Sequence, residues 1–277
     1  MITDTERTLP ERYWMAARNL AFILAATDHG PMILNRLDYA RTADGAEYGV
    51  GLDILRTGSY ARTDTDLLFN LLAARRTQFG DGVVALDCGA NIGVHTVDLA
   101  RRMTGWGQII GIEAQERIFY ALAGNIALNN CDNARAMLAA VTAVPGPILV
   151  PAPDYHAPGS FGSLELRPSA TTEFIGQPIN YTPAAMTEVA GISIDSLALP
   201  RLDLVKIDIE GMEIEALDGA AETLRTAKPI IFAEHIKVGR QRLTDVLEPA
   251  GYTIFVTGMN ILAIHGSDPT LTLVSQG

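Results

Sequence analysis

The residues best suited to chemistry lie in a short turn after an apolar segment. Val83–Leu86 is apolar, and the next positions read D-x-G-x-N-x-G from Asp87 to Gly93. An apolar strand, a glycine-containing turn and a following helix form the ligand cradle of doubly wound α/β proteins. A dinucleotide fingerprint has a glycine where Asp87 stands, because the backbone must approach a pyrophosphate there. A carboxylate would repel a pyrophosphate and favour a cationic ligand.

S-adenosylmethionine is the cofactor that fits this turn, because it carries an amine and a sulfonium. Glu113 ends the next apolar segment, Gln108–Ile112, and is placed to accept hydrogen bonds from ribose hydroxyls. Tyr60 could cover the methionine end of the cofactor, although an ordinary loop aromatic explains it equally well. The residues predicted to bind the cofactor are Asp87, Gly89, Ala90, Asn91, Gly93, Thr96, Glu113, Ala114 and Tyr60.

A second acidic motif runs from Asp203 to Glu213, where a predicted strand ends and a helix begins. Strand alternation places Lys206 and Asp208 on one face, with Glu210 beyond them at the tip. One interpretation is structural, with a buried Lys206–Asp208 ion pair and acidic residues that favour the helix N-terminus. The functional interpretation is that Asp208 or Glu210 acts as general base, orients a substrate hydroxyl or holds a divalent cation.

Glu234 and His235 end the apolar segment Ile230–Ala233 and are expected at the same rim of the sheet, unless they only terminate the strand. A carboxylate cluster there would raise the pKa of one member by mutual repulsion. His95 is expected to be an ordinary helix residue. The residues predicted to act in catalysis are Asp208, Glu210, Glu234, Lys206 and His235, and the three carboxylates could also hold a divalent metal ion.

The elements that position these residues alternate between strand and helix from about residue 81 to the end of the chain. We expect strands at 83–86, 108–112, 134–141, 202–207, 230–233, 252–256 and 261–264, and helices at 92–103, 116–129, 213–226 and 239–249. The last two strands are joined by only four residues, 257–260, which forces an antiparallel hairpin. The predicted fold is therefore a doubly wound, Rossmann-like α/β sheet of about seven strands that ends in an antiparallel hairpin.

One long insertion interrupts this alternation between about residues 145 and 190. It is rich in Pro, Gly, Ser and Thr, and its length predicts a functional segment, which we interpret as a substrate lid. Two alternating stretches, Ile148–Val150 and Ser163–Leu166, are expected to pair as a hairpin. Residues 81–277 would then form the cofactor-binding domain with this lid inserted.

Residues 1–80 are expected to form a cap of helices and small strands. A capping box at Thr8–Glu11 predicts a helix that continues to about Asp28. Short strands are expected at 32–35 and 48–55, followed by a helix capped by Asp64 or Thr65 and ended by Gly80.

The composition limits the classes of partner that this protein is expected to bind. A net charge of −11 disfavours nucleic acid as the main partner, because phosphate contacts need clustered Lys and Arg. The two cysteines provide neither a disulfide framework nor metal-ligand spacing. The longest apolar run near the N-terminus is too short to span a membrane, so a cytoplasmic protein without a membrane partner is expected. The oligomeric state stays open, with a homodimer as one alternative.

At these motifs the chain resembles the FkbM family of methyltransferases. The matching stretches are LDCGANIGVHTVDLA (86–100), GIEAQERIFYALAGNIALNN (111–130), GSFGSLEL (159–166), SIDSL (193–197), DLVKIDIEGMEIEALDGA (203–220) and PIIFAEH (229–235). The resemblance implies a class I methyltransferase fold, S-adenosylmethionine as donor with S-adenosylhomocysteine as product, and O-methylation of a sugar, glycan or specialised metabolite. It also implies that Ser160, Phe161, Gly162 and Ser163 belong to the active-site lid.

Two other functions remain as alternatives. A nicotinamide-dependent oxidoreductase shares the fold, but the missing glycine and the terminal hairpin weigh against it. A non-catalytic module that binds S-adenosylmethionine is opposed by the retained Lys206, Asp208 and Glu210.

Overall fold

The computed structural model describes residues 20–274, and its centre is one mixed β-sheet of nine strands. The strand order is β12-β13-β11-β10-β5-β6-β7-β9-β8. Six parallel strands form the middle of the sheet: β5 (Val83–Cys88), β6 (Gly107–Glu113), β7 (Ala134–Val141), β9 (Met186–Ile192), β10 (Leu204–Ile207) and β11 (Ile230–Glu234). The order reverses between β5 and β10, and in open α/β sheets ligands bind at the carboxyl ends of the strands beside such a reversal.

Antiparallel strands close both edges of the sheet. At one edge, β12 (Tyr252–Thr257) and β13 (Asn260–His265) form the predicted terminal hairpin, with β13 antiparallel to β11. At the other edge, the insertion contributes β9 (Met186–Ile192), which is parallel to β7, and the edge strand β8 (Gly146–Pro151), which is antiparallel to β9. These two strands raise the count from about seven to nine. The expected pairing of Ile148–Val150 with Ser163–Leu166 is wrong, because β8 pairs with β9 and Phe161–Ser163 is a 3₁₀ turn.

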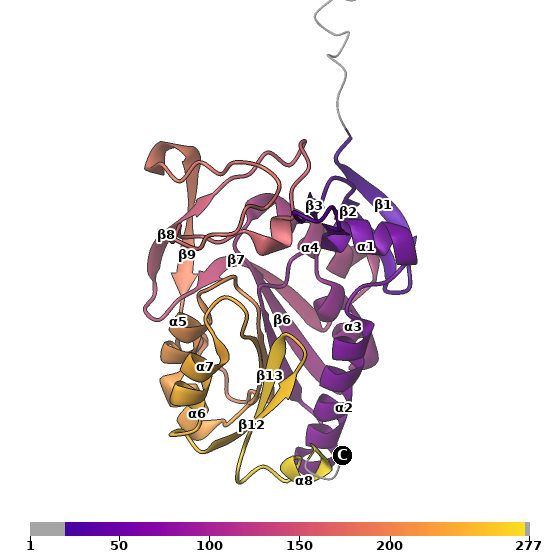
Figure 1. Ribbon diagram of the computed structural model, residues 1–277. Coiled ribbons are helices and arrows are strands. Elements are labelled where there is room, and N and C mark those ends of the chain that lie inside the picture. The colour runs from indigo at the N-terminus through magenta and orange to yellow at the C-terminus, as the bar shows by residue number, and fades with distance from the viewer. Residues whose placement is uncertain (1–19, 275–277) are drawn as a thin grey trace, which may run out of the picture.

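Helices cover both faces of the sheet, as strand alternation requires. Val83 and Ala85 pack with α2 (Arg62–Phe79), α3 (Val94–Arg102) and α4 (Glu116–Leu128). Val84 and Leu86 point to the opposite face, toward α5 (Glu213–Asp218), α6 (Ala221–Thr226) and α7 (Arg240–Leu247). Figure 1 shows α2 and α3 along one side of the sheet and α5, α6 and α7 along the other.

The expected helix 213–226 is divided into α5 and α6. Gly219 lies between them, where a Cβ would stand 2.4 Å from the backbone oxygen of Thr142. This close approach to the end of β7 requires glycine, which also favours a helix break.

The N-terminal part is a small cap that differs from the expectation. It contains β1 (Phe22–Thr27), β2 (Gly30–Asn35), β3 (Ala40–Arg41), β4 (Glu47–Tyr48) and α1 (Val50–Thr57). The expected helix to Asp28 is wrong over Phe22–Thr27, which pairs with β2 through a turn that ends at Gly30 (φ +96°). The start of that helix, with its capping box, lies outside the described residues.

Two further expectations for the cap fail for local reasons. The alternating segment 48–55 forms mostly helix α1, because Val50 and Ile54 bury the same face at helical spacing. Helix α2 begins at Arg62 without a side-chain cap from Asp64 or Thr65, and Ala61 before it has a left-handed backbone.

The last element of the described residues is α8 (Leu271–Val274). Across residues 20–274, none of the helices combines the length and the apolar character needed to cross a membrane.

Candidate active site

A cavity of about 500 Å³ opens at the carboxyl ends of β5, β6, β10 and β11. The structure brings ten of the predicted site residues to its wall. They are Tyr60, Gly89, Ala90, Asn91, Glu113, Ala114, Lys206, Asp208, Glu210 and Glu234. Asp87, Gly93, Thr96 and His235 do not line it.

The turn after β5 is held in a conformation that needs its glycines. Gly89 has a φ of +78°, and a Cβ there would stand 1.7 Å from the backbone oxygen of Asp208. Gly93 has a φ of +91°, and Asn91 between them also has a left-handed backbone at +50°. The turn therefore lies directly against the end of β10, which forms a cradle that any larger side chain would fill.

Glu113 is buried at the end of β6 and joins the turn to the next segment. Its carboxylate accepts hydrogen bonds from the backbone N–H of Asn91 (2.9 Å) and of Gln115 (2.8 Å). Burial raises the pKa of Glu113 to about 7, although these backbone hydrogen bonds oppose the shift. A carboxylate fixed in this way at the cavity wall is suited to hold a diol such as a ribose.

Asp87 lies behind the cavity wall, at 1% exposure, and is engaged by two neighbours. Its carboxylate accepts a hydrogen bond from the Thr96 hydroxyl (2.7 Å) and lies 3.3 Å from the Lys206 ammonium. Burial alone would raise the pKa of Asp87, but Lys206 lowers it below the ordinary value. The geometry makes Asp87 a support for the turn and for Lys206, which itself reaches the cavity.

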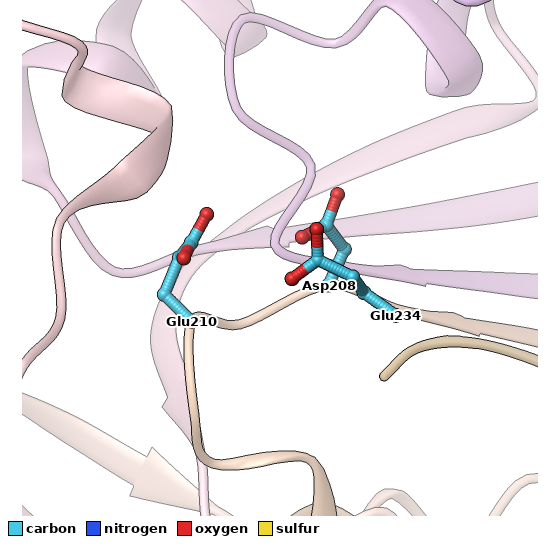
Figure 2. A group of neighbouring side chains, drawn as sticks. All are labelled: Asp208, Glu210 and Glu234. Atoms are coloured by element: carbon cyan, nitrogen blue, oxygen red, sulfur yellow. The ribbon is translucent and has the colours of Figure 1, made fainter. Parts of the chain in front are cut away.

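Asp208, Glu210 and Glu234 form an acidic triad at the ends of β10 and β11 (Figure 2). One carboxylate oxygen from each lies within 4.8 Å of the others. Burial and the charge of Asp208 raise the pKa of Glu234 to about 7 and that of Glu210 well above its ordinary value. A carboxylate with a pKa near neutrality is suited to accept a proton at working pH.

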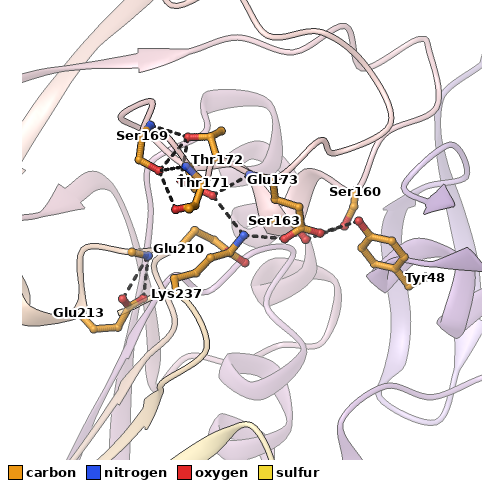
Figure 3. Close-up of polar contacts among 12 residues, drawn as sticks. Tyr48, Ser160, Ser163, Ser169, Thr171, Thr172, Glu173, Glu210, Glu213 and Lys237 are labelled. Carbon is orange, nitrogen blue, oxygen red and sulfur yellow. Dashed lines mark hydrogen bonds and ion pairs between the residues drawn. The ribbon is translucent and has the colours of Figure 1, made fainter. Parts of the chain in front are cut away.

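The cavity also contains polar residues that the sequence analysis missed. Lys237 donates to Glu173 (2.6 Å) and Glu165 (3.2 Å), and its ammonium lies 3.6 Å from Glu210. Glu173 in turn accepts a hydrogen bond from the Tyr48 hydroxyl (2.6 Å), so it joins the cap to the segment after β11 (Figure 3). The only sequence signals were the presence of Glu165 in GSFGSLEL and the position of Lys237 soon after Glu234.

The insertion reaches the cavity through the segment that the family resemblance singled out. Ser160, Gly162 and Ser163 line the cavity, whereas Phe161 is completely buried in the core. The side-chain amide of Gln115, another residue that was not predicted, donates to the backbone oxygen of Phe161 (2.8 Å). Asp38 of the cap accepts from the Phe161 N–H (2.9 Å), so the cap and the core both fix this segment.

The two histidines are placed differently from each other. His235 lies outside the cavity lining, and its ring is 3.3 Å from the backbone oxygen of Gly258 in the β12–β13 turn. His95 lines the cavity, and its Nε2 is buried without a hydrogen-bond partner in the described part of the chain. Burial and Lys206 lower the pKa of His95 to about 4, so this imidazole is neutral at neutral pH.

The acidic triad offers the oxygen ligands that a divalent cation prefers. Two of these three carboxylates already have an ammonium partner in place of a metal ion, because Lys206 lies 3.5 Å from Asp208 and Lys237 lies 3.6 Å from Glu210. The residues present therefore fit a metal ion poorly, and no chemical step below depends on one.

Comparison with known proteins bears on this site. A family model described as the methyltransferase FkbM domain matches residues 87–254, which is more than half of the chain. A comparison with curated protein sequences gave no significant match.

Several solved structures are similar to the chain at low identity. They include methyltransferase FkbM from Methylobacillus flagellatus KT, at 16% identity over 67% of this chain and 43% of that chain, with a TM-score of 0.44. Precorrin-6y C5,15-methyltransferase from Geobacter metallireducens GS-15 matches at 13% identity over 73% and 86%, with a TM-score of 0.44. Magnesium protoporphyrin IX methyltransferase from Synechocystis PCC 6803 matches at 14% identity over 78% and 92%, with a TM-score of 0.42.

Structural similarity at these TM-scores does not identify the family of the chain. The chain spans less than half of the Methylobacillus flagellatus protein. The sequence match of the family model carries the assignment, and the strand order and terminal hairpin agree with a class I methyltransferase sheet. The chain belongs to the FkbM family of S-adenosylmethionine-dependent methyltransferases.

Proposed function

We propose that this methyltransferase methylates a hydroxyl oxygen of a small-molecule or glycan acceptor, a sugar or a specialised metabolite. The acidic triad supports this proposal most directly, because Glu234 has a pKa of about 7 and lines the same cavity as the cofactor turn. A hydroxyl is a weak nucleophile that gains from partial deprotonation, and a carboxylate of this pKa can accept its proton. Nucleic acid is not the proposed acceptor, since the net charge is −11.

The donor would be held by the turn after β5 and by Glu113. Glu113 would accept hydrogen bonds from the ribose hydroxyls, and Gly89, Ala90 and Asn91 would present backbone to the rest of the donor. Asp87 would act through the turn and through Lys206, because Thr96 and Lys206 already engage its carboxylate. Tyr60 enters the same cavity from the loop before α2 and would cover the donor.

The acceptor would be handled by the acidic triad with Lys206. When bound, S-adenosylmethionine supplies an activated methyl group: the acceptor oxygen bonds the methyl carbon while the carbon–sulfur electron pair stays on sulfur. Glu234 takes the hydroxyl proton, and Asp208 orients the hydroxyl beside the Lys206 ammonium. Most of the acceleration then comes from positioning, because the electrophile is already activated by its charge.

Two variants separate the donor role from the acceptor role. Glu113→Ala should weaken both S-adenosylmethionine and S-adenosylhomocysteine by about 10- to 100-fold, because two charge-assisted hydrogen bonds are lost. Asp208→Asn should leave S-adenosylhomocysteine affinity intact and lower turnover by about 100-fold or more. Isothermal titration calorimetry and transfer of labelled methyl groups to a panel of hydroxylated sugars and metabolites measure the two effects.

Glu116 at the start of α4 is half-buried and lies outside the cavity lining, so it provides a matched control, and Glu116→Gln should change neither quantity. Unchanged affinity in Glu113→Ala would contradict the ribose assignment. NMR of the product locates the new methyl group, and a methyl on nitrogen or carbon would contradict O-methylation. Tight binding of S-adenosylhomocysteine without turnover of any acceptor would favour a non-catalytic binding module.

A further inference from the structure

The charges in the cavity wall and directly behind it do not balance. The Lys206 ammonium is shared between Asp87 (3.3 Å) and Asp208 (3.5 Å). The Lys237 ammonium is shared among three carboxylates, those of Glu165, Glu173 and Glu210. Five carboxylates therefore contact two ammonium groups, and the local charge is negative before Glu234 is counted, even when Glu210 is protonated.

Glu234 adds to this excess. Within residues 20–274, no Lys, Arg or His forms an ion pair with its carboxylate, although it lies in the acidic triad. Oε2 of Glu210 is buried and accepts no hydrogen bond from the described residues. In a partly enclosed cavity such charges are screened less than in water, so the triad attracts a cation that enters.

We infer that the acidic triad makes this enzyme bind its cationic donor in preference to its neutral product. The inference rests on the proposed function, because it requires the reacting sulfur to lie at the triad side of the cavity. The donor and product differ only by the methyl group and the positive charge on sulfur. The ratio of the two affinities therefore depends on the surroundings of the sulfur, because both ligands make the same contacts through the ribose and adenine.

This preference would also assist turnover. Methyl transfer removes the positive charge from the donor, and the acceptor proton moves to the triad as the product ether forms. The attraction that held the sulfonium is then absent from the product complex. The carboxylates that attracted the donor therefore do not hold S-adenosylhomocysteine in the same way, and its release becomes easier.

The test compares three ligands on the intact protein by isothermal titration calorimetry at pH 8, with EDTA so that no divalent cation neutralises the triad. S-adenosylmethionine should bind about tenfold more tightly than S-adenosylhomocysteine, the expected scale for one favourable charge contact. Sinefungin carries an amine in place of the sulfonium methyl and should resemble the donor. Equal or tighter binding of S-adenosylhomocysteine would overturn the inference.

A charge-removing variant then locates the effect. Glu234→Gln should reduce the preference for S-adenosylmethionine by about threefold or more while leaving S-adenosylhomocysteine affinity within about twofold. Glu188→Gln removes the same charge from an exposed site on β9, outside the cavity lining, and should leave the preference unchanged. An equal change in both variants would show that the triad is not responsible.

The result is distinguishable from failure of the proposed function. If none of the three ligands binds the folded wild-type protein, the cofactor assignment fails and the inference fails with it. If all three bind with equal affinity, the methyltransferase proposal stands and only the charge preference is lost. Glu210→Gln provides a second variant if Glu234→Gln does not fold.

Discussion

Glu234, the proposed general base, has a pKa that links the stability of the fold to pH. Burial and the charges of Asp208 and Glu213 raise its pKa from 4.5 to about 7. Between about pH 4.5 and pH 7, the folded protein therefore keeps a proton on Glu234 that the unfolded chain has released. The stability that the folded state has with a neutral Glu234 side chain is fully present below pH 4.5 and is lost as the pH rises through about 7, because the buried side chain then becomes ionised.

The Glu234→Gln variant should therefore be more stable than the wild type at pH 8 but not at pH 4.5. We expect a gain of about 1–2 kcal/mol in the free energy of unfolding at pH 8, discounted for the partial exposure of the group. Urea denaturation at the two pH values measures the difference. Glu188→Gln is the control. If Glu234→Gln stabilised the protein by the same amount at both pH values, the raised pKa of Glu234 would be contradicted.

At the scale of single elements, the turn after β5 depends on Gly89. A Cβ there would stand 1.7 Å from a backbone oxygen of Asp208, and the φ of +78° disfavours any side chain. Gly89→Ala should lower the free energy of unfolding by about 2 kcal/mol or more and should also weaken S-adenosylhomocysteine binding. Thermal denaturation and calorimetry test both effects.

Gly146 on β8 is the matched control for this substitution. A Cβ there meets no atom within 4 Å, and the backbone is not left-handed. Gly146→Ala should leave ligand affinity unchanged. Ligand affinity in Gly89→Ala that equals the wild type would show that the turn can shift without losing its cradle.

The insertion is fixed to the core by the ammonium of Lys237. Lys237→Met would leave Glu165, Glu173 and Glu210 close together without their shared cation, and their repulsion should release the segment from 160 to 175. Amide hydrogen exchange should rise by about tenfold or more in that segment, while β9 exchanges as before. Lys237→Arg should restore protection. Unchanged exchange would show that other contacts hold the insertion.

The elements also show what the sequence could and could not predict. The parallel strands and the terminal hairpin were predictable, because apolar runs, turn residues and a four-residue link are local signals. The pairing of β8 with β9 was not, since it joins segments separated by 34 residues with an irregular stretch between them. Lys237 was missed for the same reason, because its three partners come from distant parts of the chain.

At the scale of the whole molecule, the proposed active site and a buried ion network lie at opposite ends of the sheet. The cavity occupies the carboxyl ends of the parallel strands, whereas a buried ion network occupies their opposite ends. There Asp203 accepts from Arg75 (3.1 Å), from Arg201 (2.8 Å) and from the backbone N–H of Val84 (2.9 Å). Arg75 is also paired with Asp268, which joins α2 to the C-terminal segment. This network contains no residue of the cavity lining.

Loss of Asp203 should therefore affect folding and leave the active site intact. Asp203→Ala leaves the buried guanidinium of Arg75 without one partner and the N–H of Val84 without its acceptor, which should cost about 3–5 kcal/mol of unfolding free energy. The exposed Asp81, which pairs with Arg76 at 2.6 Å, is the control, and Asp81→Ala should cost less than about 1 kcal/mol. Protein that remains folded in Asp203→Ala should bind S-adenosylhomocysteine with wild-type affinity by calorimetry below the unfolding transition. Wild-type affinity is expected because the sheet lies between the ion network and the cavity. Weaker binding in the folded protein would show that the ion network also sets the geometry of the cavity.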